Sequence, residues 1–175
     1  MHITVSAPEP LMRRISPDKK IDVNLANFGR IPFGLTLQGP LYYESSNANA
    51  CSPLNKTALA HVYAVSRLPH AFVIATRGEC SFEDKVNNAQ QASASFLLIV
   101  NNMPAENIHD LVMVSSNKHK VFNTSAALVS NMAGQALTSY LREDYMRGAR
   151  IKLVLNLPVS KTITPSIEFL YTPTD

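Results

Sequence analysis

The chain has 175 residues, a hydrophobic fraction of 46% and a charged fraction of 17%, which are typical of one globular domain with its own core. Its formal charge is only +3, and the densest basic group (Arg13, Arg14, Lys19, Lys20) has no aromatic residues interleaved with it, which argues against nucleic-acid binding. No stretch approaches the roughly 18 consecutive apolar residues of a spanning helix, so we expect membrane attachment only through a segment outside this chain.

The first thirty residues are polar and contain three prolines, which predicts an arm with one short edge strand at Ile21–Leu25. Residues 31–43 predict extended structure interrupted by Gly34, Gly39 and Pro40. The alternating or continuous apolar patterns that follow predict strands at residues 62–65, 71–76, 95–100, 111–114, 126–129, 149–157 and 167–171.

Two helices are expected between these strands. Ser81-Phe-Glu-Asp84 fits a capping box, and apolar side chains then recur at helical spacing. Ser130 or Asn131 caps a second helix that runs to about Met146 and is ended by Gly148. Two strand–helix units among many strands predict an α+β or mixed β-sandwich domain.

Two features indicate the secretory route, although the chain does not begin with a signal peptide. N-glycosylation acceptor patterns begin at Asn55 and Asn123. The two cysteines, Cys51 and Cys80, are either buried free thiols or a disulfide, and a glycosylating compartment favours the disulfide. We therefore expect a luminal or extracellular piece of a longer protein.

The sequence contains no arrangement typical of catalysis. The five histidines are far apart, which argues against a metal site, and neither a nucleophile elbow nor a phosphate-binding glycine motif occurs. Glu83 and Asp84 are adjacent, so they predict first-turn acids that complement the helix dipole rather than an acid–base pair. We expect no catalytic residue, cofactor or metal here, and the turn Arg77–Cys80, before a helix N-terminus, is the best candidate for ligand contacts.

The segment from Ala71 to Asn101 resembles the core of a protease-associated (PA) domain. The family pattern is matched at Arg77, Gly78, Cys80, Phe82, Lys85, Asn88, Ala89, Ala92, Ala94 and Asn101. The segments 50–54 and 126–137 resemble the upstream cysteine segment and a later strand and helix of such domains. Two residues depart from the pattern: Ser93 stands where the family usually has Gly, and Glu79 adds a negative charge where Gly is also common.

The resemblance implies an α+β fold, a PA-domain β-sandwich or open β-barrel flanked by two or more α-helices. It covers residues 31–157 as the domain core, and leaves 1–30 as an arm packed on the domain and 158–175 as a C-terminal strand and tail.

In function, the resemblance implies a non-catalytic luminal domain that recognises peptide or protein cargo. The whole protein would be a membrane-anchored RING-type ubiquitin ligase or a vacuolar or endosomal sorting receptor; the alternative is a PA domain that gates substrate access in a peptidase. Arg77 and Glu79 are the candidate ligand contacts. A purely structural role stays open, in which Arg77 caps the strand or pairs with Glu79 or Asp84.

Overall fold

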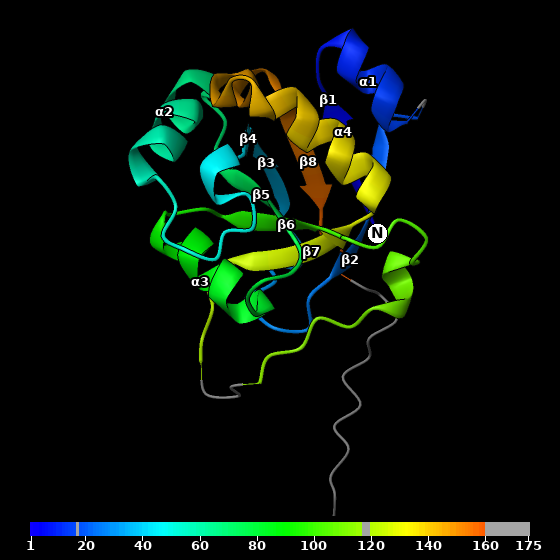
Figure 1. Cartoon of the computed structure of the whole chain (residues 1–175), viewed down its shortest axis with the longest axis vertical. Helices are drawn as coiled ribbons and strands as arrows, with labels where there is room; N and C mark the ends of the chain where they lie inside the picture. The colour runs from blue at the N-terminus through cyan, green and yellow to red at the C-terminus, as the bar shows by residue number, and fades with distance from the viewer. Residues whose placement is uncertain (17, 117–119, 160–175) are drawn as a thin grey trace, which may run out of the picture.

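The computed structural model describes residues 1–16, 18–116 and 120–159, and its centre is one mixed sheet of eight strands (Figure 1). The strands are β1 (His2–Ser6), β2 (Lys20–Leu25), β3 (Thr36–Gly39), β4 (Leu41–Tyr42), β5 (Phe72–Thr76), β6 (Phe96–Val100), β7 (Ser125–Val129) and β8 (Lys152–Asn156). The helices are α1 (Glu9–Ile15), α2 (Lys56–Ser66), α3 (Phe82–Gln91) and α4 (Asn131–Arg142), with 3-10 segments η1 (Ser45–Asn47), η2 (Ile108–Asp110) and η3 (Tyr145–Arg150).

The sheet has the order β3-β8-β1-β2-β7-β6-β5-β4 and is nearly closed into a barrel. The pairs β4–β5, β5–β6 and β6–β7 are parallel. All pairs from β7 through β2, β1 and β8 to β3 are antiparallel. The two ends of the sheet approach each other where the amide of His70 donates to Gln38 and that of Phe72 donates to Pro40. The fold is therefore α+β, as the sequence pattern predicted, with the open-barrel architecture that the family resemblance implied.

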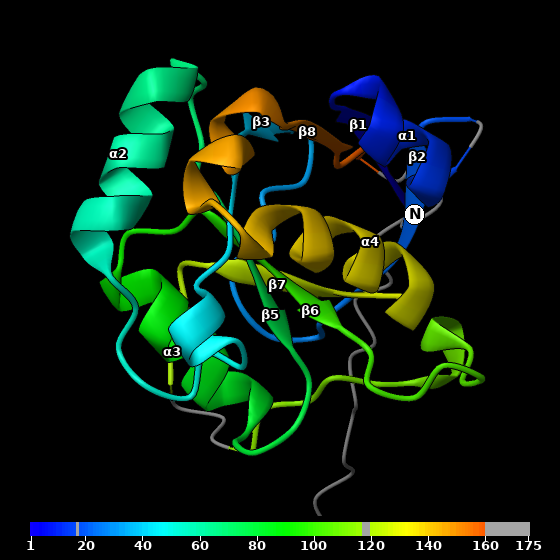
Figure 2. The ribbon, with the colours of Figure 1, turned by 45° about the horizontal axis from the view of Figure 1, so that its top comes forward.

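Two apolar cores lie on opposite faces of the sheet. Along β5, Phe72 and Ile74 belong to the first core, whereas Val73 and Ala75 belong to the second. Helices α1 and α4 pack on the first core and α2 and α3 on the second, as the separation of these pairs in Figure 2 shows. Because β5 to β7 are buried on both faces, their sequences are continuous apolar runs rather than alternating ones.

The strand predicted at residues 62–65 is wrong, because this segment lies inside α2. Asn55 caps the helix by accepting from the amide of Ala58 at 3.0 Å. Leu59 and Val62, three positions apart, are both buried in the second core, whereas Val65 is exposed. A helical face that fits the core thus overrides the β propensity of a short apolar run.

The strand predicted at residues 111–114 is also wrong. Residues 111–114 form no strand: Val112 and Val114 point to solvent, and the carbonyl groups of Leu111 and Met113 accept hydrogen bonds from Asn24 and from the backbone of Asn27.

The second predicted helix, α4, ends at Arg142 rather than near Met146. Asp144 then caps a separate 3-10 segment by accepting from the amide of Met146. Gly148 lies within that 3-10 segment instead of ending α4.

The predicted strand at Ile21–Leu25 corresponds to β2, but β2 is not an edge strand, since it lies between β1 and β7. The sequence also missed β1 and α1, which lie within the first thirty residues. The domain boundaries near residues 30 and 157 stay predictions, and the strand expected at residues 167–171 lies outside the described residues.

Candidate functional site

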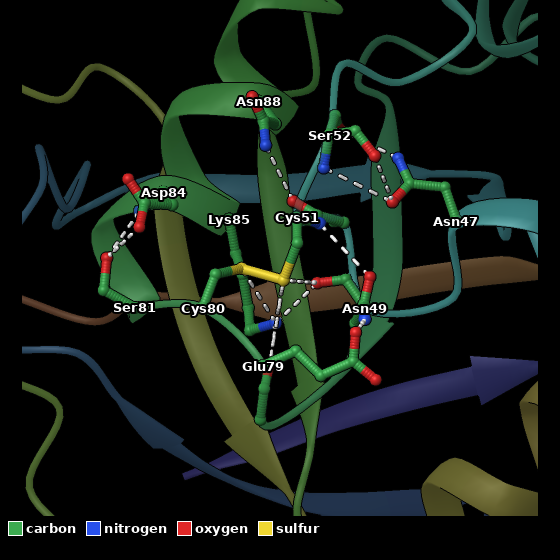
Figure 3. The surroundings of a disulfide bond; sticks show 12 residues. Asn47, Asn49, Cys51, Ser52, Glu79, Cys80, Ser81, Asp84, Lys85 and Asn88 are labelled. Atoms are coloured by element: carbon green, nitrogen blue, oxygen red, sulfur yellow. Dashed lines mark hydrogen bonds between the residues drawn. A yellow bond between two sulfur atoms is a disulfide. The ribbon is translucent and has the colours of Figure 1, made fainter.

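The turn of residues 77–80 connects the end of β5 to the start of α3 and is the centre of the predicted site (Figure 3). Gly78 and Glu79 both adopt positive φ angles, of 107° and 66°, and the amide of Cys80 bonds back to the carbonyl of Gly78. Ser81 then caps α3: its hydroxyl accepts from the amide of Asp84 at 3.1 Å and donates to the Asp84 carboxylate at 2.7 Å. Half of the expected capping box is present, since the carboxylate bonds the hydroxyl rather than the backbone.

A disulfide between Cys51 and Cys80 joins this turn to the segment of residues 48–51 (Figure 3). The structure therefore agrees with the disulfide interpretation of the two cysteines. Further bonds hold the same segment: the Asn88 amide donates to the carbonyl of Ala50 at 2.8 Å, and the backbone amide of Thr76 donates to that of Ala48 at 2.8 Å. The disulfide therefore reinforces a junction that hydrogen bonds also define.

Lys85 lies beneath the disulfide with its side chain completely buried. Its Nζ donates to the carbonyl oxygens of Asn49 at 2.6 Å and Gly78 at 2.7 Å. The same nitrogen is 3.4 Å from Sγ of Cys51 and 3.5 Å from Sγ of Cys80. One ammonium group thus connects both sides of the junction.

Burial controls the electrostatics of this ammonium group. It lowers the pKa of Lys85 from 10.5 to about 8, because the charged form loses its hydration, and the carboxylates of Glu79 and Asp84 offset part of that effect. At neutral pH Lys85 is still mainly protonated and brings a positive charge next to the two sulfur atoms.

Arg77 pairs with Glu106, which the sequence did not indicate, rather than with Glu79 or Asp84. Its Nη1 donates to Glu106 Oε2 at 2.9 Å and to Oδ1 of the buried Asn101 at 2.9 Å. The side chain of Arg77 is only 29% exposed, so this contact positions the guanidinium group firmly. Within the described residues, its Nε and Nη2 make no hydrogen bond.

Glu79 is exposed and turns the other way, toward the segment that carries Cys51, where the side-chain amide of Asn49 donates to its carboxylate. The two predicted ligand contacts, Arg77 and Glu79, therefore share the turn without contacting each other. The Glu79 carboxylate adds a negative charge to this turn, which opposes a purely anionic ligand there.

The roles of the remaining motif residues are architectural. Asn101, whose side chain is buried, bonds Arg77, Glu106 and the carbonyl of Met103. The motif match identified Asn101, Lys85 and Asn88 without a role, whereas no sequence signal marked Glu106 as the partner of Arg77, since 29 residues separate them.

Two clefts of the described structure are lined by residues outside the motif turn. A cleft of about 390 Å³ between the start of α2 and the end of α4 includes Glu44, Asn55 and Tyr42, and burial together with Glu44 raises the pKa of Tyr42. A groove of about 290 Å³ has Glu106, the partner of Arg77, among its lining residues together with Ile108 and Met132. Glu106 thus belongs both to the lining of this groove and to the ion pair of Arg77.

Both glycosylation candidates have exposed side chains. Asn55 caps α2 with its Oδ1, which leaves its amide nitrogen directed away from that bond. Asn123 is exposed next to Thr124 and Ser125, whose hydroxyl groups are buried and hydrogen-bonded to backbone carbonyls. In residues 1–16, 18–116 and 120–159, no helix has the length and apolar character to cross a membrane, and no three His, Cys, Asp or Glu side chains are grouped as metal ligands.

Comparison with known proteins identifies a family and several similar proteins. A family model described as "PA domain" matches residues 37–137. The Arabidopsis thaliana "Receptor homology region, transmembrane domain- and RING domain-containing protein 1" is 34% identical over 100 residues, which are 57% of this chain and 30% of that protein. Vacuolar-sorting receptor 2 of the same plant is 34% identical over 82 residues, 47% of this chain and 13% of the receptor.

A similar fold occurs in a zinc aminopeptidase from Bacillus subtilis, with a TM-score of 0.51 and 16% identity over 87% of this chain and 29% of the enzyme. That likeness concerns the fold alone. The matched regions are less than a third of each of these proteins, so the chain corresponds to one part of them.

Proposed function

Because this chain belongs to the PA domain family, we propose that it is a non-catalytic recognition domain that binds peptide or protein cargo. The observation that carries the proposal is the hydrogen bonding of the Arg77 guanidinium group. Its Nη1 is fixed by Glu106 and Asn101, and its other guanidinium nitrogens make no hydrogen bond within the described residues. Glu106 also lines a groove of about 290 Å³. The presence of a sorting receptor and a RING-domain protein among the relatives supports this role.

The arrangement favours an extended peptide over a small anion. A guanidinium group already neutralised on one edge by Glu106 can still donate to a carbonyl or carboxylate on the other edge. Glu79 disfavours a high density of negative charge, so a peptide carbonyl or a single carboxylate fits best. An apolar side chain of the same peptide can occupy the groove between Ile108 and Met132.

Replacement of Arg77 tests this role, provided that the effect of the broken ion pair is separated from the loss of the donor. Peptides selected from a random library on the wild-type chain serve as probes, and their affinities are measured by fluorescence titration. We expect Arg77→Met to weaken binding by about 10-fold or more, since a charge-assisted hydrogen bond contributes roughly 1.5–3 kcal/mol.

The matched control is Glu106→Gln, which removes the same ion pair but keeps the guanidinium group, so its affinity stays within about three-fold of wild type. Equal losses in Arg77→Met and Glu106→Gln, or no loss in either, would reject Arg77 as a ligand contact.

The whole protein, in this proposal, is a membrane-anchored RING-type ubiquitin ligase or a sorting receptor, with this domain on the luminal or extracellular side of the secretory or vacuolar system. The relatives named above support it. Ubiquitin-chain formation by the full-length product with purified activating and conjugating enzymes separates the ligase from the receptor. Loss of mass on endoglycosidase treatment, absent in a double Asn55→Gln and Asn123→Gln variant, tests the luminal location.

The second candidate is a PA domain that gates substrate access in a peptidase, and it is favoured by the occurrence of the fold in a zinc aminopeptidase. Peptide hydrolysis by the full-length product, changed in substrate range when this domain is deleted, would support it. Absence of hydrolysis in the full-length product would reject it.

A further inference from the structure

We propose that the Cys51–Cys80 disulfide is a site of thiol–disulfide exchange with external dithiols, in which Lys85 stabilises the departing thiolate of Cys80. This chemistry is separate from peptide recognition and does not depend on it. It follows from the position of a fully buried ammonium group against both sulfur atoms, together with the location of Cys80 before a helix.

The contacts of Lys85 place a positive charge where a thiolate would form. Its Nζ is 3.4 Å from Sγ of Cys51 and 3.5 Å from Sγ of Cys80, and the side chain is inaccessible to water. A cation next to a cysteine lowers the thiol pKa, and exchange is faster when the departing thiol has a lower pKa. Lys85 thus assists cleavage of the bond that lies over it.

Cys80 is the better leaving group of the two cysteines. It immediately precedes Ser81, the N-cap of the ten-residue helix α3, so the positive end of the helix dipole also favours its thiolate. The carboxylates of Glu79 and Asp84 oppose this effect, but both side chains are exposed, whereas Lys85 is buried. Cys51 has no helix N-terminus behind it, and we assign it as the sulfur that is attacked.

The reaction balances without a further reactant. One thiolate of the dithiol attacks Sγ of Cys51, the Cys51–Cys80 bond breaks, and Cys80 leaves as a thiolate paired with the Lys85 ammonium group. The second thiol of the reagent then attacks the mixed disulfide and expels Cys51. The dithiol is oxidised to a cyclic disulfide, the protein disulfide is reduced to two thiols, and the protons released by the reagent match those taken up by the cysteines.

The junction is held by more than the disulfide, so reduction need not unfold the domain. The carbonyl groups of Ala48, Asn49 and Ala50 still accept from Thr76, Lys85 and Asn88. Reduction therefore loosens the segment that orients Glu79 while the barrel persists, and it links the turn that carries Arg77 to the thiol redox state of its surroundings.

The test measures thiol pKa values in single-cysteine variants by the ultraviolet absorbance of the thiolate during a pH titration. In the Cys51→Ser chain, we expect the pKa of Cys80 to be at least one unit below the ordinary value of about 8.5, which means about ten-fold more thiolate at neutral pH. In Cys80→Ser, the pKa of Cys51 should be lowered less. Adding Lys85→Met should return Cys80 to about 8.5 or above, whereas adding Lys56→Met, at an exposed lysine of α2, should change nothing.

A pKa of Cys80 at or above the ordinary value with Lys85 in place overturns the proposal, and so does a pKa that Lys85→Met leaves unchanged. If Lys85→Met fails to fold, the Cys51→Ser titration decides alone. As a kinetic check, reduction of the native wild-type chain should be first order in dithiothreitol; a rate independent of its concentration would mean that the bond opens only after unfolding and would also overturn the proposal.

Discussion

Ser93 lies in a conformation that favours glycine, which makes Ser93→Gly a test of how the chain stores backbone strain. The residue follows the last turn of α3 with a φ of 70°. The amide of Ala94 bonds the carbonyl of Ala89 at 3.0 Å, and the amide of Ser93 bonds that of Gln90 at 2.9 Å. This pair of bonds is a Schellman motif, whose left-handed position is usually Gly.

The expected change in the free energy of unfolding is the difference between two opposing contributions. The left-handed conformation costs an L-residue roughly 1–2 kcal/mol, and glycine avoids this cost. Glycine also gives the unfolded chain more conformational freedom, which lowers the free energy of unfolding by about 0.4–1 kcal/mol. The Ser93 side chain is exposed and makes no hydrogen bond within the described residues, so nothing else is lost on its removal. We therefore expect Ser93→Gly to raise the free energy of unfolding by about 1 kcal/mol, or the Tm by about 2–4 °C.

Urea denaturation followed by circular dichroism measures this change, with Ser93→Ala as the control. Alanine keeps the Cβ atom and hence the strain, so the control should stay within about 0.5 kcal/mol of wild type. A Ser93→Gly chain no more stable than Ser93→Ala would refute the argument from strain.

Two further predictions concern the buried residues Lys85 and Gly148. Because the folded pKa of Lys85 is lowered to about 8, the unfolded chain binds more protons between about pH 8 and pH 10.5, and raising the pH through that window favours the folded state. Relative to Lys85→Met, wild type should gain stability there by up to about 3 kcal/mol in urea titrations, and parallel pH profiles for the two chains would contradict this. Gly148→Ala should destabilise the fold by about 3 kcal/mol, because the added Cβ would lie 1.7 Å from the carbonyl oxygen of Leu41; a Tm equal to that of wild type would show that η3 can move away.

Much of the fold was predictable because its signals are local. Because β5 and β6 are buried on both faces, they require continuous apolar runs. The cap at Ser81 depends only on residues close to it in the chain. The prediction failed for residues 62–65, where a four-residue apolar run fits either period, and only the fit of Leu59 and Val62 to the second core selects a helix.

The candidate site was likewise predictable only in part. A resemblance over a short motif was sufficient to single out Arg77, Glu79 and the two cysteines. It was not sufficient to predict what they contact: Glu106 comes from a loop 29 residues away, and Asn49 from the segment on the other side of the disulfide.

The family, the two-cysteine pattern and the candidate ligand turn could be recognised from the amino-acid order alone, because a compact motif specifies a strand, a turn and a helix start through local conformation. The folded molecule was needed to show that β1 and β2 complete the barrel, that Lys85 lies against the disulfide and that Arg77 is held by Glu106. These features depend on which distant segments pack together, and packing is selected by the whole buried surface rather than by the residues next to each other in the chain.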